Sequence, residues 1–136
     1  MSFKTVISSE NAPKAIGPYS PALCVNGLVY LSGQLPVNPA SGKIDCTDIE
    51  GQTRQSMENI CALLKEAELT CADVIKTTVL LADIGDFAAM NAVYARYFSA
   101  PYPTRSCFQV AALPMGAKVE IEAICARGRI SYQEDR

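Results

Sequence analysis

The stretch ALCVNGLVYLS at residues 22–32 predicts a β-hairpin near the start of the chain. Two short apolar runs flank Asn26-Gly27, and an Asn-Gly pair in this setting is a strong hairpin signal because both turn positions need a positive φ. Ahead of the hairpin, residues 3–7 alternate in polarity and predict a short strand. Residues 8–21 hold two prolines before Ser20, at positions 13 and 18, and predict a surface loop that joins this strand to the hairpin.

Downstream of the hairpin, apolar residues at helical spacing predict two helices. Thr or Asp stands just before the first apolar stripe and Asp just before the second, where they can cap the first turn. Gln52 lies off the first stripe. The predicted bounds are Thr47 or Asp48 to about Glu68, and Asp83 or Asp86 to about Phe98. The first stripe consists of Ile49, Thr53, Met57, Ile60, Leu64 and Ala67.

Three further strands complete the predicted fold. Residues 74–82 are almost continuously apolar and rich in β-branched side chains, which is typical of a central strand. Residues 105–112 and 118–126 predict the last two strands, and residues 33–47 a loop with a turn at 38–42. The order β-ββ-α-β-α-ββ predicts an α+β fold with a mixed β-sheet and both helices packed on one face.

Two helices cover only one face of such a sheet. The other face carries Val, Leu, Ile and Cys residues beside polar ones. A small domain with an uncovered apolar face usually buries it against copies of itself, so we expect an oligomer.

Length and composition narrow the classes of protein. The 136 residues predict a single domain, 1–136. Net charge is −2, which does not fit a basic nucleic-acid surface or a polybasic membrane patch. The N-terminus lacks a long apolar signal region and no stretch approaches a membrane span, so we expect a cytoplasmic protein without a membrane partner.

Six cysteines and no histidine shape the expected chemistry. No two cysteines form a CxxC pair, so neither a zinc site nor an iron–sulfur site is expected. We expect most of the thiols to be small buried hydrophobes in a reducing compartment. Acid–base chemistry must run on carboxylates, hydroxyls, thiols, lysines or the backbone.

Arg105 and Glu122 form the main candidate site. The last two strands are expected to form a hairpin. If its turn is centred between Pro114 and Met115, Cys107 lies opposite Glu122 and Arg105 lies diagonal to it, about 7–8 Å away. A cation that binds carboxylate would then share a face with a carboxylate that accepts a proton. The alternatives are a cross-strand salt bridge or a solvated glutamate, and a slip of one residue would move Glu122 to the other face.

Four further residues are candidates for the edge of a site. Tyr19 lies in a loop held by glycine and proline, where it can reach a ligand or pack on the core. Ser32 and Gly33 follow a strand and can present a hydroxyl and a backbone N–H to a ligand, or simply cap the strand. Asn91 lies among core residues of the second helix, where its amide either forms structural hydrogen bonds within the core or belongs to the edge of the site.

Five motifs stand in a fixed order along the chain: AIGPYSPA at 15–22, VYLSGQLP at 29–36, NAVYARYF at 91–98, PTRS at 103–106 and VEIEA at 119–123. With them the chain resembles the Rid family of reactive intermediate deaminases, also called the YjgF family, over nearly its whole length. The resemblance implies a chorismate-mutase-like fold, a homotrimer with three clefts between subunits, and hydrolysis of reactive enamines and imines such as 2-aminoacrylate to 2-oxo acids and ammonia. The implied enzyme is a 2-iminobutanoate/2-iminopropanoate deaminase that needs no cofactor and no metal.

Roles for the candidate residues follow from that chemistry. Arg105 would hold the substrate carboxylate, and Glu122 would orient the attacking water and accept its proton. The backbone of Cys107 would contact the imine nitrogen or the tetrahedral centre, while Tyr19 and Ser32 would close the cleft. We expect one subunit to supply Arg105 and Glu122, and its neighbour to supply part of the wall. The predicted catalytic residues are Arg105, Glu122, Tyr19 and Ser32, and the predicted substrate-binding residues are Arg105, Cys107, Gly33 and Asn91.

Two other functions remain open on the sequence. One is an endoribonuclease, an activity also associated with this family, although the missing histidine and the acidic balance argue against RNA as a partner. The other is a non-catalytic module in which Arg105 captures 2-oxo acids or similar metabolites.

Overall fold

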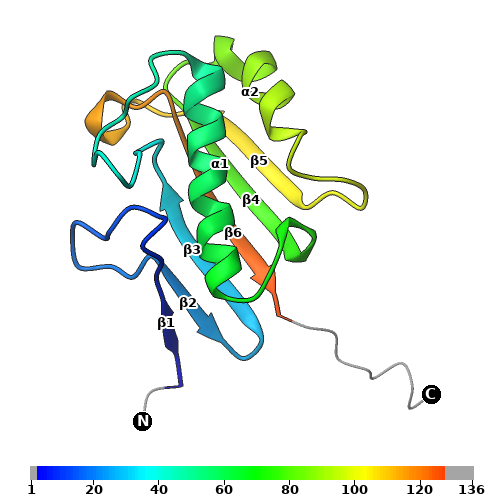
Figure 1. The fold of residues 1–136 in the computed structure, drawn as a ribbon. Helices are drawn as coiled ribbons and strands as arrows, with labels where there is room; N and C mark the ends of the chain where they lie inside the picture. The colour runs from blue at the N-terminus through cyan, green and yellow to red at the C-terminus, as the bar shows by residue number, and fades with distance from the viewer. Residues whose placement is uncertain (1–2, 128–136) are drawn as a thin grey trace.

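Six strands form one sheet, and two α-helices lie across one of its faces (Figure 1). The structure is a computed structural model that describes residues 3–127. The order of elements is the predicted β-ββ-α-β-α-ββ, and the α+β class is confirmed. The strands are β1 Thr5–Ile7, β2 Ala22–Val25, β3 Leu28–Gln34, β4 Val74–Leu81, β5 Thr104–Gln109 and β6 Val119–Ala126. The α-helices are α1 Ile49–Glu66 and α2 Phe87–Tyr94, with 3₁₀ turns η1 Cys71–Asp73, η2 Ile84–Asp86 and η3 Pro114–Gly116.

The Asn26-Gly27 hairpin is confirmed. Both residues have positive φ, 49° and 81°, which the two-residue turn requires. Val25 and Leu28 pair on either side of it, so β2 and β3 are antiparallel neighbours.

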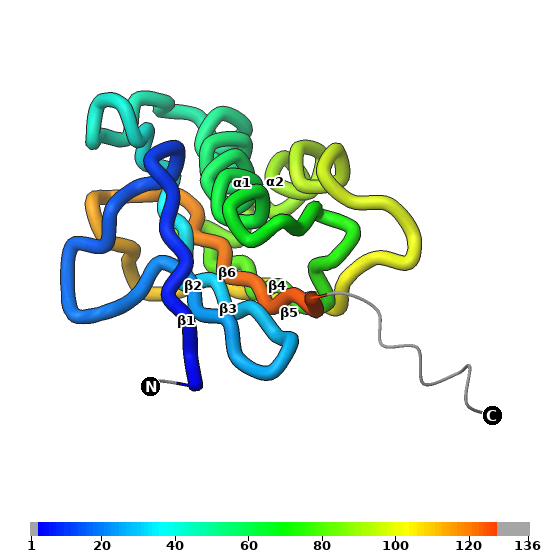
Figure 2. The backbone as a smooth tube through the Cα atoms, turned by 60° about the horizontal axis from the view of Figure 1, so that its bottom comes forward, coloured from blue at the N-terminus to red at the C-terminus, as the bar shows by residue number. Residues whose placement is uncertain are grey.

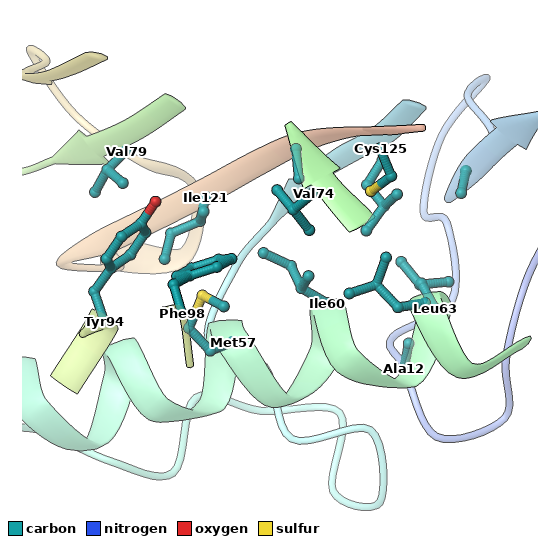
Figure 3. Close-up of a cluster of buried hydrophobic side chains, with 14 of the residues drawn as sticks. Ala12, Met57, Ile60, Leu63, Val74, Val79, Tyr94, Phe98, Ile121 and Cys125 are labelled. Atoms are coloured by element: carbon teal, nitrogen blue, oxygen red, sulfur yellow. The ribbon is translucent and has the colours of Figure 1, made fainter. Parts of the chain in front are cut away.

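Helix α1 begins where the sequence predicts and packs its predicted stripe against the sheet. Asp48 caps it by accepting a hydrogen bond from the backbone of Gly51. All six residues of the stripe are buried. Figure 3 shows Met57, Ile60 and Leu63 in the layer between α1 and the sheet. This layer is the core that fixes α1 over the strands.

One polar residue of α1 is buried as well. Gln52 donates to the carbonyl of Cys46 at 2.9 Å and accepts from the backbone N–H of Lys118 at 2.8 Å. The apolar stripe does not include Gln52, yet its side chain is almost fully buried. It joins the start of α1 to the residue that precedes β6.

The second helix is shorter than predicted. Its regular part ends at Tyr94 rather than near Phe98, and η2 precedes it. Phe98 nevertheless packs on Tyr94, with ring centroids 4.7 Å apart, so the predicted apolar face continues beyond the helix.

The prediction that the last two strands form a hairpin is wrong. The order across the sheet is β1-β2-β3-β6-β4-β5, so β4 lies between β5 and β6. Strand β5 pairs parallel to β4 and β6 pairs antiparallel to it. The β4–α2–β5 crossover places β5 beside β4 on one edge, as parallel pairing through a helix requires. The long connection, residues 110–118, then carries β6 to the other edge of β4.

Both helices cover the same face of the sheet, as Figure 2 shows, and the opposite face is open. A row of paired residues crosses that open face: Val6 pairs with Leu23, Leu23 with Tyr30, and Tyr30 with Ile124. Val6 and Tyr30 are 59% and 45% exposed. Apolar side chains of β1, β2, β3 and β6 are therefore left uncovered by this single chain.

Candidate active site

Arg105 lies under α2 at the edge of the sheet. Its Nη1 donates to Oδ1 of Asn91 at 2.7 Å. The guanidinium carbon lies 4.9 Å from the ring centroid of Tyr94 and 5.5 Å from that of Phe87. Such contacts hold a guanidinium through the ring quadrupoles and leave most of its N–H donors free. Asn91 thus contacts the main candidate residue rather than serving only the core.

Tyr94 is itself fixed in place. Its hydroxyl shares a 2.7 Å hydrogen bond with Thr77 of β4. Burial raises the pKa of Tyr94, so the phenol stays neutral and presents its ring face to Arg105. Thr77 is also the residue that pairs with Arg105 across β4 and β5. The arginine is therefore held by the strand below it and the helix above it.

Cys107 is half-buried two residues further along β5 and lies on the same face as Arg105. Burial raises the pKa of its thiol, although the guanidinium of Arg105 acts in the opposite direction. Strand β5 is the last strand on this side of the sheet, so one of its edges has no neighbouring strand within residues 3–127. That edge is where the backbone of Cys107 can meet a ligand. We call Asn91, Arg105 and Cys107 the arginine cluster.

Glu122 lies on the other face of the sheet. Thr77 pairs with Arg105 on one side and with Ala123 on the other, whereas Glu122 pairs with Thr78. Successive side chains on a strand point to opposite faces. The prediction that Arg105 and Glu122 share a face is therefore wrong, because it assumed a hairpin that does not form.

Glu120 is a carboxylate that the sequence pattern did not single out. It shares its face with Glu122, two residues further along β6, and lies against Gly33. A Cβ atom added at Gly33 would lie only 2.5 Å from Oε2 of Glu120. Burial first, and the charge of Glu122 second, raise the pKa of Glu120. The spacing Glu-Ile-Glu did carry a signal, since it places both carboxylates on one face.

Ser32 and the Tyr19 loop meet at the end of β3, next to Gly33. The hydroxyl of Ser32 donates to the carbonyl of Ser20 at 2.6 Å, and its backbone N–H donates to the carbonyl of Pro21 at 2.9 Å. Tyr19 is 50% exposed, so it does not pack into the core. We call Tyr19, Ser32, Gly33, Glu120 and Glu122 the carboxylate cluster.

The predicted site residues thus fall into two clusters within one copy of the chain. The arginine cluster lies on the helix face at the β5 edge. In the carboxylate cluster, both glutamates lie on the open face, Glu120 lies against Gly33 at the end of β3, and Ser32 joins this end to the loop that carries Tyr19. Two surface hollows are lined by other residues, chiefly 5–8 with 66–68 and 8–15. Among residues 3–127 there is no group of three potential metal ligands. No helix in this part of the chain is long and apolar enough to cross a bilayer.

Known proteins resemble this chain along almost its full length. A 2-iminobutanoate/2-iminopropanoate deaminase of Capra hircus is 47% identical over 128 residues, covering 94% of this chain and 93% of the relative. The enzyme with the same name in Escherichia coli strain K12 is 45% identical, covering 89% of this chain and 96% of the relative.

Solved structures agree with the fold. E. coli TdcF with bound serine has a TM-score of 0.87 at 46% identity, covering 91% of this chain and 99% of that one. The YjgF gene product of E. coli also gives 0.87, at 43% identity, with the same coverage of both chains. The family model described as endoribonuclease L-PSP matches residues 9–127. This chain therefore belongs to the endoribonuclease L-PSP family, which is the Rid or YjgF family.

Proposed function

We propose that this protein is an enzyme that hydrolyses reactive 2-imino acids, and the enamines that tautomerise to them, to 2-oxo acids and ammonia. The names of relatives that span almost the whole chain support this activity. The observation that carries it in the molecule is Arg105, a half-buried cation held by Asn91 and two aromatic rings. A cation fixed in this way suits the carboxylate that every 2-imino acid carries.

Arg105 holds the substrate carboxylate in this proposal. A guanidinium has five N–H donors, and the hydrogen bond to Asn91 uses only one. The remaining donors can form the bidentate pair that planar carboxylates favour. Asn91 binds the substrate through this arginine, and the backbone of Cys107 contacts the imine nitrogen or the tetrahedral centre.

A carboxylate of β6 activates the water. The water oxygen bonds to the imine carbon and one water proton passes to the carboxylate. The nitrogen gains that proton, the C–N bond breaks and ammonia leaves, while the added hydroxyl gives its proton to the carboxylate and forms the C=O bond of the 2-oxo acid. Because a protonated imine is already electrophilic, positioning and electrostatics suffice without a cofactor.

Glu120 suits this step better than Glu122. A base works best when its pKa lies near the working pH, and the pKa of Glu120 is raised by burial and by Glu122. Glu122 is exposed. Its role as the proton acceptor stays a prediction. Tyr19 and Ser32 close the site, and the backbone of Gly33 lines it next to Glu120.

The complete site is shared between subunits of a homotrimer. Arg105 and both glutamates lie on opposite faces of one sheet, so one copy's arginine cluster has to meet the carboxylate cluster of its neighbour. The uncovered apolar side chains of the open face supply the surface for that association. This replaces the expectation that one subunit supplies both Arg105 and Glu122.

Ammonia and 2-oxo acid release tests the activity. An amino-acid oxidase generates the imino acid, and the rate is followed with and without this protein, using Arg105→Ala as the low-activity control. Binding of 2-oxobutanoate without turnover would favour the metabolite-binding module. The ribonuclease alternative, which the family description favours, predicts RNA cleavage that falls steeply with salt.

The cytoplasm is the proposed location. All six cysteines are free thiols, as is usual in a reducing compartment. Fractionation of the native host, with the protein detected by antibody, tests this.

A further inference from the structure

Two half-buried thiols lie in contact on the helix side of the sheet. Cys61 is in the second half of α1, and Cys71 is the first residue of η1, just before β4. Their Sγ atoms are 3.7 Å apart in a thiol–thiol hydrogen bond. A disulfide needs about 2.05 Å, so the two sulfur atoms have to approach by only about 1.7 Å. Neither thiol belongs to the arginine cluster or the carboxylate cluster.

The backbone between the two thiols keeps them together. The pair is only ten positions apart in the chain. Helix α1 ends between them, where the backbone of Ala67 donates to Leu63 and that of Leu69 donates to Leu64 at 2.8 Å. A closed turn of this kind presents one thiol to the other at high effective concentration. Pairing within one chain is then much faster than pairing between chains.

The surroundings favour one thiolate in this pair. The hydrogen bond from Cys61 lowers the pKa of Cys71 and raises that of Cys61. Burial raises the pKa of Cys107 and raises that of Cys125 to about 12. Cys46 contacts the guanidinium of Arg54 instead of a second thiol.

We propose that Cys61 and Cys71 are a reversible dithiol–disulfide pair that reduces hydroperoxides, a redox function separate from imine hydrolysis. The thiolate of Cys71 attacks a peroxide oxygen, so that an S–O bond forms and the O–O bond breaks, and the leaving hydroxide or alkoxide takes the proton that Cys71 released and departs as water or an alcohol. Cys61 then attacks the resulting sulfenic sulfur. The S–S bond forms, the S–O bond breaks, and hydroxide leaves as water with the Cys61 proton. The two thiols lose two electrons, which the peroxide gains.

The test uses the full-length reduced protein and one equivalent of hydrogen peroxide. Thiols counted under denaturing conditions should fall by two of the six. Digestion without reductant should give one new peptide pair that joins Cys61 to Cys71 and is lighter by two hydrogen atoms. A dithiol reductant should restore both thiols. Retention of all six thiols, or a disulfide that joins other cysteines or two chains, overturns the proposal.

Serine variants identify the attacking thiol. In Cys71→Ser, loss of the Cys61 thiol should slow by about tenfold or more, because the lower-pKa thiolate is missing. In Cys61→Ser, a dimedone-type reagent should trap sulfenic acid on Cys71, because the resolving thiol is missing. The matched control Cys46→Ser should form the disulfide at the wild-type rate. If the thiols of Cys71→Ser, Cys61→Ser and Cys46→Ser are all lost to hydrogen peroxide at the same rate, Cys61 and Cys71 are not a dedicated pair.

Discussion

Arg105 and Glu122 both belong to strands that pair with β4, yet their side chains leave the sheet on opposite faces. Thr77 of β4 aligns with Arg105, and the next residue, Thr78, aligns with Glu122. This one-residue offset separates the cation from the carboxylates within one chain. Under the proposed function, a reaction that uses both groups draws them from two copies of the chain.

Replacing Arg105 by Ala should lower kcat/KM by on the order of 10- to 100-fold or more, because a charge-assisted contact to substrate contributes about 1.5–3 kcal/mol. Arg105→Lys should restore little, since an ammonium cannot reproduce the planar fork. Steady-state ammonia release measures both variants, and thermal unfolding checks that they fold. Turnover near the wild-type rate in Arg105→Ala would remove this residue from the site.

Glu120→Gln should bind a 2-oxo acid but turn over slowly, because an amide holds water and cannot accept its proton. Glu122→Gln, its matched control, should remain active. Its acid limb of kcat/KM should shift to lower pH, because the charge of Glu122 helps to raise the pKa of Glu120. Below that pKa the base is protonated and the rate falls. A slow Glu122→Gln enzyme beside an active Glu120→Gln enzyme would restore Glu122 as the proton acceptor.

Gly33→Ala should reduce turnover with little change in thermal stability. The new methyl group would lie 2.5 Å from Oε2 of Glu120, so the carboxylate has to move away. A double-mutant cycle provides the control, because in a Glu120→Ala background the same change should cost nothing further. Additive losses in the cycle would mean that Gly33 acts independently of Glu120.

Cys107→Ser should lower kcat only slightly. The role proposed for Cys107 belongs to its backbone, which serine keeps. Burial also raises the pKa of the thiol, which disfavours the thiolate that nucleophilic catalysis requires. Complete inactivation, or a substrate adduct found on Sγ by mass spectrometry, would point to covalent catalysis instead.

Mixing the two slow variants Arg105→Ala and Glu120→Gln should restore activity. Arg105→Ala subunits keep the carboxylate cluster and Glu120→Gln subunits keep the arginine cluster, so mixed copies of the proposed trimer would contain some intact sites. The check is to unfold and refold the two together and measure turnover against each variant refolded alone. A fully active monomer in sedimentation at low concentration would rule out the shared site.

Local patterns in the sequence predicted most elements, and non-local pairing explains the main errors. Asn26-Gly27 and Asp48 act through neighbouring backbone, so their turn and cap could be read directly. The position of β4 between β5 and β6 depends on which strands pair across the whole sheet, and no local pattern encodes it. The choice of Glu122 as the carboxylate depends on its register with Arg105 in a hairpin. Because that hairpin does not form, the sequence pattern gave no reason to prefer Glu122 to Glu120.

The buried amide of Gln52 has a consequence for how β6 is threaded into the sheet. Its hydrogen bond to the N–H of Lys118 fixes the chain one residue before β6 begins. If β6 entered one residue out of step, Ile121 would turn to the open face and Glu120 and Glu122 toward the apolar layer. The side-chain amide of Gln52 in α1 thereby fixes the register of β6 and keeps the two carboxylates outside the core.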